Sequence, residues 1–207
     1  MRNYTGYSCC KSELHSKYGT NDWFNEVLGY LIIRYYPAET RILDTLRYVE
    51  LHPKNKETFS YEFGSIIRDI GSIFSSILDT LVRNTTTEYQ DTYDIRNYRQ
   101  FLIKEIKDIE LVGVQINSPF VYNLILPFDN IKDTKTRLDW WDAYNNLKHS
   151  EIENYQDGCL TNVVYGMASL AILYTLMDPN RRAEGRLFSL IGYFTPLEMV
   201  KTFLFPK

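Results

Sequence analysis

Cysteine and histidine are both scarce in this chain, and their scarcity excludes several classes of protein. The sequence of 207 residues contains three of each: Cys9, Cys10, Cys159, His15, His52 and His149. Adjacent cysteines bridge each other poorly, and an odd number of cysteines does not form a disulfide framework. We therefore expect reduced thiols and a cytoplasmic location. Because no Cys/His spacing fits a zinc site, we expect no metal and no other cofactor.

A positive net charge and a membrane-spanning run are also lacking. The net charge of −3 excludes a uniformly basic nucleic-acid-binding surface, although it allows a local basic patch. The uncharged stretch 163–177 has 15 residues, which is too short to cross a bilayer. We expect it to be a buried central helix, and we expect no membrane association. The phosphate-binding glycine loops, the nucleophile elbow and the Glu-x-x-His pair of di-iron bundles are not found either.

Helical periodicity and aromatic side chains are what the sequence has in abundance. Aromatic residues make up 15% of the chain, and 17 of them are tyrosines, which suit interfaces and half-wet clefts. The periodicity predicts an all-α fold, a bundle of five to seven helices in a single domain over 1–207. Within it we distinguish three parts: a polar N-terminal arm (1–20), a core (60–177) and a C-terminal extension (180–207).

The predicted helices follow from apolar spacing and from proline and capping residues. Pro37 should end a first helix and begin a second, whereas Thr195, Pro196 and Glu198 form a capping box. The helices are expected over 21–36, 37–51, 60–83, 94–108, 138–150 and 154–177, with a short one from Thr195. Between them, the β-branched stretches 109–117 and 121–127 predict a small β-hairpin near 109–127.

The stretch 138–150, LDWWDAYNNLKHS, concentrates the side chains that suit chemistry. On a helix, Trp140, Ala143, Tyr144 and Leu147 share one apolar face. A second stripe runs beside it and contains Trp141, Asn145, Lys148 and His149. Histidine titrates near physiological pH, and a nearby lysine favours its neutral, basic form. This stripe could bind an anion or move a proton, although a packing helix with a histidine near its C-terminus would show the same pattern.

A second candidate lies on the helix expected over 60–83. Gly64, Arg68, Gly71 and Ser75 form a stripe in which the two glycines suggest close approach by another backbone or by a ligand. If this helix packs against 138–150, Arg68 could add a positive charge to that site. The alternative is that Arg68 pairs with one of the flanking carboxylates, Glu62 or Asp69, on a solvated face.

The residues Tyr144–His149 (YNNLKH) resemble the motif region of the HEPN superfamily. Trp140 and Trp141 precede them, and a long apolar helix is expected to follow. The resemblance covers roughly 60–177 and implies an all-helical domain that is commonly dimeric. In active members, an arginine, a polar residue and a histidine serve metal-independent RNA cleavage where two protomers meet. His149 takes the place of the motif histidine and Asn145 that of the polar residue, whereas Tyr144 stands in the place of the arginine.

Two functional classes stay open at this stage. In the first, the protein is a metal-independent ribonuclease of a toxin–antitoxin or phage-defence type, with His149, Asn145 and Lys148 as catalytic residues. In the second, the same groove binds RNA or a nucleotide without cutting it, or docks a protein. The ligand-binding residues would be those that surround the groove: Tyr144, Trp141, Arg68, Asp69 and Glu62. The resemblance implies a homodimer, and an antitoxin or regulatory protein as a further partner.

Overall fold

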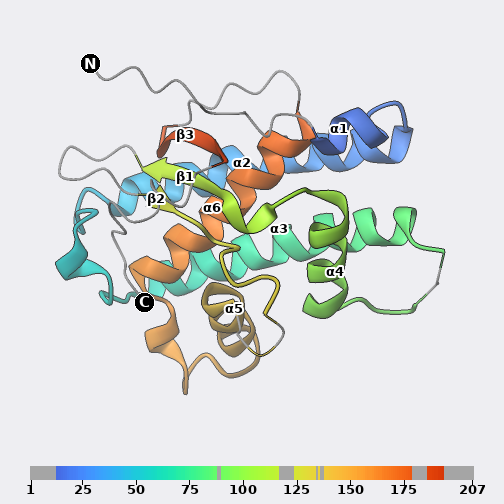
Figure 1. Cartoon of the computed structure of the whole chain (residues 1–207). Coiled ribbons are helices and arrows are strands. Elements are labelled where there is room, and N and C mark those ends of the chain that lie inside the picture. Colours follow the sequence, from blue (N-terminus) through green and yellow to red (C-terminus); the bar gives the residue numbers. More distant parts are fainter. Residues whose placement is uncertain are drawn as a thin grey trace, which may run out of the picture.

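Helices dominate the computed structural model, which describes residues 13–87, 90–116, 124–133, 135, 138–178 and 186–193 (Figure 1). The α-helices of this part are α1 Glu13–Tyr18, α2 Asp22–Thr45, α3 Tyr61–Thr85, α4 Ile95–Glu105, α5 Asp139–Ser150 and α6 Leu160–Met177. Three short 3-10 helices are η1 Pro53–Asn55, η2 Ile109–Leu111 and η3 Tyr155–Asp157. The prediction of an all-α bundle with a small hairpin is confirmed.

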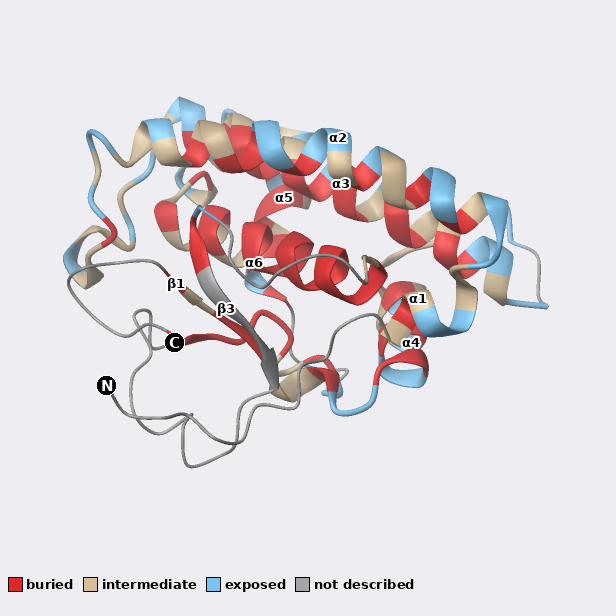
Figure 2. Ribbon diagram, turned by 90° about the horizontal axis from the view of Figure 1, so that it is seen from above, coloured by how far each residue is buried: buried red, intermediate tan, exposed pale blue. Residues whose placement is uncertain are grey.

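Helix α6 lies at the centre of the fold. It contacts α2, α3 and α5, and also the strands β1 Val112–Ile116 and β3 Phe188–Tyr193. Figure 2 shows α2 and α3 side by side with exposed outer faces, and α6 buried between them and the strands. By length and composition α6 could cross a membrane, but 83% of it is buried inside the protein. It is the central buried helix that the uncharged stretch 163–177 predicts.

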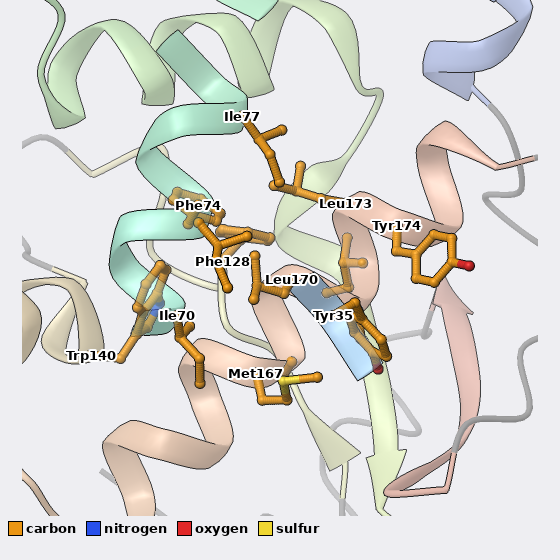
Figure 3. Packing of buried hydrophobic residues seen from close by; sticks show 14 of the residues in the cluster. Tyr35, Ile70, Phe74, Ile77, Phe128, Trp140, Met167, Leu170, Leu173 and Tyr174 are labelled. Carbon is orange, nitrogen blue, oxygen red and sulfur yellow. The ribbon is translucent and has the colours of Figure 1, made fainter. Parts of the chain in front are cut away.

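The core is built mainly from the inner faces of α2, α3 and α5 and from α6, which is buried along most of its length (Figure 3). The apolar residues that recur at helical spacing along α3 are all buried: Phe63, Ile66, Ile67, Ile70, Phe74, Ile77 and Leu81. The ring of Phe74 lies 5.0 Å from that of Trp140 at an interplanar angle of 87°, the edge-to-face arrangement that aromatic quadrupoles favour. The same ring lies 6.3 Å from Phe128, which joins the region before α5 to the core.

The predicted break at Pro37 is wrong, because α2 continues through it from Asp22 to Thr45. Pro37 has no N–H, so the carbonyl of Ile33 loses its helical hydrogen bond. Both residues are exposed, Ile33 by 72%, so this bond is lost on the solvent side of α2. On the opposite side, Tyr35, Ala38 and Ile42 are buried on both sides of the proline. Tertiary burial of this inner face therefore outweighs the loss of one helical hydrogen bond.

The predicted hairpin is present, and a third strand joins it. Strand β1 pairs antiparallel with β2 Leu124–Ile125, with Val114 opposite Ile125. On its other edge β1 pairs antiparallel with β3, so that the sheet order is β2-β1-β3. The chain between the two hairpin strands and the short helix expected from Thr195 lie outside the described residues.

Three further boundaries differ from the predictions. Part of the expected polar arm is helix α1, whose Leu14 is completely buried. Helix α4 ends at Glu105 instead of 108, and it buries Tyr98, Phe101 and Leu102. Helix α6 begins at Leu160 instead of 154, because the chain first passes close to α3: a Cβ on Gly158 would lie 2.7 Å from the Cα of Gly64.

Candidate functional site

Helix α5 packs antiparallel against α3 along the two glycines of the α3 stripe. A Cβ on Gly71 would lie 2.2 Å from the ring carbon Cγ of Tyr144, and a Cβ on Gly64 would lie 3.8 Å from a methyl group of Leu147. Tyr144 is 5% exposed, so its ring fills the space that the side chain of residue 71 would occupy. The close approach that the glycines predict is thus made by the ring of Tyr144.

Trp141 also belongs to the core, where it is 6% exposed. Its ring lies 5.1 Å from Tyr144 and 5.7 Å from Tyr98 of α4. The phenol of Tyr98 donates a hydrogen bond to Asp79, and burial and then this bond raise its pKa. The structure thus places Trp141 and Tyr144 in packing positions beneath the surface, not on a face that a ligand reaches.

The polar end of the stripe faces solvent. Lys148 and His149 are exposed, and Asn145 is half-buried one turn before His149. The ammonium of Lys148 lies 5.6 Å from the centre of the Tyr144 ring, a cation–π distance. Helix α5 begins after Leu138, which makes no side-chain capping bond. We call Asn145, Lys148 and His149 the polar stripe of α5.

Arg68 lies beside this helix, as the hypothesis of packing between the two helices requires. Its guanidinium donates to the carboxylate of Glu151, the residue that ends α5. Both side chains are about one-third exposed, 28% for Arg68 and 32% for Glu151. The predicted alternative, in which Arg68 pairs with Glu62 or Asp69, is wrong.

Those two carboxylates bind a residue that the sequence did not point to, Arg41 of α2. Its guanidinium contacts Asp69, lies 2.8 Å from Glu62 and donates to Ser65 at 3.0 Å. Glu62 and Asp69 are seven residues apart on α3 and so face the same neighbouring helix. This cluster joins α2 to α3, whereas the Arg68–Glu151 pair joins α3 to α5.

A hydrophobic hollow adjoins the polar stripe where α3 begins and α5 ends. Its volume is about 590 Å³, and Gly64 and Leu147 form its floor. Four large side chains around it are unusually exposed: Phe59 by 46%, Tyr61 by 79%, Ile152 by 91% and Tyr155 by 51%. We call these four residues the apolar rim. Ile152 follows His149 by three residues and lies in the turn after α5, which ends at Ser150, so the rim begins just after the polar stripe in the chain.

A second pocket, of about 290 Å³, opens where α5 and α6 begin. The residues that line it include Asp129, Asp139, Trp140 and Tyr165, which come from three separate segments. No motif links these positions, and only the folded chain brings them together. Over the described ranges, no cluster of three or more His, Cys, Asp or Glu side chains is arranged to hold a metal ion.

Comparison with known proteins found no matching family model, no matching curated protein and no matching solved structure.

Proposed function

We propose that this protein is a HEPN-like domain that binds RNA through the polar stripe of α5 and acts as a homodimer in the cytoplasm. The observation that supports this proposal best is the division of α5 into two parts. Trp140, Tyr144 and Leu147 are buried, whereas Lys148 and His149 are exposed to solvent, and Arg68 of the neighbouring helix pairs with Glu151 at the end of α5. A lysine and an imidazole on one exposed stripe suit a phosphate backbone, whose charge dominates the affinity of such complexes.

Binding without cleavage is the function that the positions of the cations favour. The residue in the place of the motif arginine, Tyr144, is buried, and its phenol does not supply a cation. Arg68 is held by Glu151, which neutralises much of its charge. Stabilisation of the charge that develops on a phosphate during cleavage would therefore depend mainly on Lys148.

Metal-independent cleavage is the second candidate, and the exposure of His149 favours it. An accessible imidazole can remove the proton of a ribose 2′-hydroxyl, and Asn145, four residues earlier, lies in line to orient the substrate. Such general base catalysis is worth about 10²–10⁴ in rate. A His149→Ala variant would then lose cleavage by at least that range while keeping much of its affinity for RNA.

The apolar rim supports the homodimer of the proposal. Large exposed apolar side chains around one hollow are typical of interaction sites, and tyrosine and phenylalanine are enriched in interfaces. The borders of the rim carry both signs of charge, in the pairs Arg68–Glu151 and Arg41–Glu62, so two copies related by a two-fold axis can match opposite charges. Because Ile152 lies only three residues after His149 in the chain, this interface would bring the two polar stripes near each other. An antitoxin or regulatory protein is the alternative occupant.

The experiment that tests RNA binding uses fluorescence anisotropy of a labelled mixed RNA pool in EDTA, titrated with the full chain at several salt concentrations. We expect Lys148→Ala to weaken binding about three- to tenfold and to reduce the slope of log affinity against log salt by about 1. Lys104→Ala is the matched control, because Lys104 is 74% exposed on α4. Equal binding by all three proteins, or no binding by the wild type, would refute the proposal. The same samples run on a gel decide between binding and cleavage.

A further inference from the structure

Another hydrophobic hollow adjoins the apolar rim, on the other side of the start of α3. The end of α2, the turn that follows it and the first residues of α3 line this hollow, and its volume is about 450 Å³. We call it the α2 hollow. Ser60 caps α3 by accepting a hydrogen bond from the backbone N–H of Phe63, and it lines both the α2 hollow and the hollow inside the apolar rim. The two hollows therefore belong to one surface that passes over the first turn of α3.

The two hollows lie on opposite flanks of α3. Glu62 lines the α2 hollow, whereas Gly64 lies in the floor of the other, and two helical steps separate their directions by about 200°. The ion pairs follow the same division, because Arg41 of α2 binds Glu62 and Arg68 binds Glu151 at the end of α5. The surface thus runs across α3 from α2 to α5, and charges of both signs border it on each flank.

Tyr48 stands at the edge of the α2 hollow without filling it. It lies in the turn after α2 and is 89% exposed, although it is one of the residues that line the hollow. Buried Phe63 and the partly buried Thr45 and Val49 also line it. An aromatic side chain buries about 150–250 Å² when it is covered. In a single copy of the chain, both the ring of Tyr48 and the hollow beside it are left open to water.

The four side chains of the apolar rim are too few for a stable interface by themselves. A standard interface buries about 800 Å² on each partner and takes roughly 20–30 residues from each. A homodimer built on the rim must therefore extend over neighbouring surface. The α2 hollow is apolar surface that adjoins the rim through Ser60, and it carries an exposed tyrosine, a residue type enriched in interfaces.

We propose that the dimer of the proposed function, on which this inference rests, extends across α3, and that Tyr48 of each copy fills the α2 hollow of the other. A two-fold axis that runs along this surface sets rim against rim and α2 hollow against α2 hollow, so the contact is reciprocal. The ring of Tyr48 then covers Phe63 of the second copy. Its hydroxyl lies at the border of the hollow, where Asp44 and Glu62 can accept a hydrogen bond from it.

Hydrogen exchange of the full chain, measured by mass spectrometry below and above the concentration at which it dimerises, tests how far the interface extends. We expect dimerisation to slow exchange in two separate segments, 150–156 beside the rim and 44–50 at the α2 hollow. Helix α4, which lines neither hollow, should exchange at an unchanged rate. Slower exchange of 150–156 alone would overturn this inference and leave the rim dimer intact. A chain that stays monomeric would overturn both, whereas RNA binding is decided by its own titration.

Two substitutions of Tyr48 test its part in the interface by analytical ultracentrifugation. Tyr48→Glu would bury a charge in the apolar hollow, which is unfavourable, and should weaken dimerisation at least about tenfold, whereas Tyr48→Phe keeps the ring and should stay within about threefold of the wild type. Because Tyr48 is 89% exposed, neither change disturbs the monomer. Ile33→Glu, at an exposed apolar residue outside both hollows, is the control. A Tyr48→Glu variant that dimerises as well as Ile33→Glu would overturn the inference.

Discussion

Gly71 of α3 lies directly against the ring of Tyr144 of α5, so closely that a Cβ on Gly71 would stand 2.2 Å from the ring carbon Cγ. Alanine normally stabilises a helix interior by about 1 kcal/mol over glycine. Here the methyl group would overlap a buried ring, and overpacking of this kind costs about 1–3 kcal/mol. We therefore expect Gly71→Ala to lower the free energy of unfolding by about 2 kcal/mol, measured by urea denaturation.

Gly29 of α2 provides the matched control for this substitution. No atom beyond its own helix lies within 4 Å of the Cβ that alanine would add, so Gly29→Ala should raise the free energy of unfolding by about 0.5–1 kcal/mol. A Gly71→Ala variant that is as stable as Gly29→Ala would show that Tyr144 does not pack against α3 as described.

The helical period predicted the inner face of α5, but not how wide the buried face is. Trp140, Tyr144 and Leu147 follow the spacing of a single apolar stripe and are buried as expected. Trp141 lies outside that stripe and is buried as well, because α4 covers the adjacent side of α5 through Tyr98. The number of neighbours that a short helix has is a property of the whole fold, and local spacing does not contain it.

Pairings between distant segments could not be read from the sequence for the same reason. The partners of Arg68 and Asp69 are Glu151 and Arg41, which depend on how α2, α3 and α5 pack. Strand β3 pairs with β1 from far along the chain, and the pocket at Asp129 and Asp139 joins separate segments. Capping boxes and periodicity act within a few residues, so they predict where most helices lie but not these contacts.

Pro37 allows a direct test of why α2 continues beyond the predicted break. Proline is about 3 kcal/mol less favourable than alanine inside a helix, and part of this difference is returned by its stiffening of the unfolded chain. Because Pro37 is exposed within α2, Pro37→Ala removes the backbone defect without opening the core. We expect the free energy of unfolding to rise by about 1–2 kcal/mol. A loss of stability would mean that the proline ring makes a needed contact.

Glu105 predicts how stability depends on pH. Burial disfavours its ionised form, but a hydrogen bond from the Tyr18 hydroxyl at 2.8 Å and the nearby ammonium of Lys17 outweigh burial and lower its pKa below 4.5. A carboxylate with a lowered folded-state pKa contributes stability above its unfolded pKa and loses it as the pH falls through the folded value. The wild type should therefore exceed Glu105→Gln in stability at pH 7, by about 1–3 kcal/mol.

This difference should shrink as the pH falls below 4.5, the ordinary value for the side chain. Urea denaturation of both proteins between neutral and acidic pH measures it. Tyr18→Phe removes one stabilising partner and leaves Lys17 and Lys104, so it should reduce the difference without removing it. A difference that stays constant over the whole range would contradict the role given to the charge of Glu105.

If RNA binds at the polar stripe, substitutions of Arg68 and of Glu151 should change the affinity for RNA in opposite directions. Glu151→Gln removes a negative charge and releases the guanidinium of Arg68, so RNA affinity should rise about threefold. Arg68→Ala should lower it by a similar factor, since the phosphate backbone loses a cation. Anisotropy titrations at one fixed salt concentration measure both. Changes of the same sign in the two variants would show that the pair acts only by holding α3 to α5.

Ile152 is the residue whose substitution tests the proposed dimer most sharply. It is 91% exposed, so a charged residue is tolerated in the monomer, whereas burying that charge at the centre of an interface is strongly unfavourable. We expect Ile152→Glu to weaken dimerisation by at least about thirtyfold, the loss typical of an interface hot spot. Analytical ultracentrifugation over a concentration series measures it. Ile33→Glu is the matched control, because Ile33 is 72% exposed on the outer face of α2, away from the apolar rim. Equal dimerisation of the two variants would place the interface elsewhere. A wild-type chain that stays monomeric throughout would leave the RNA site to be formed by one copy alone.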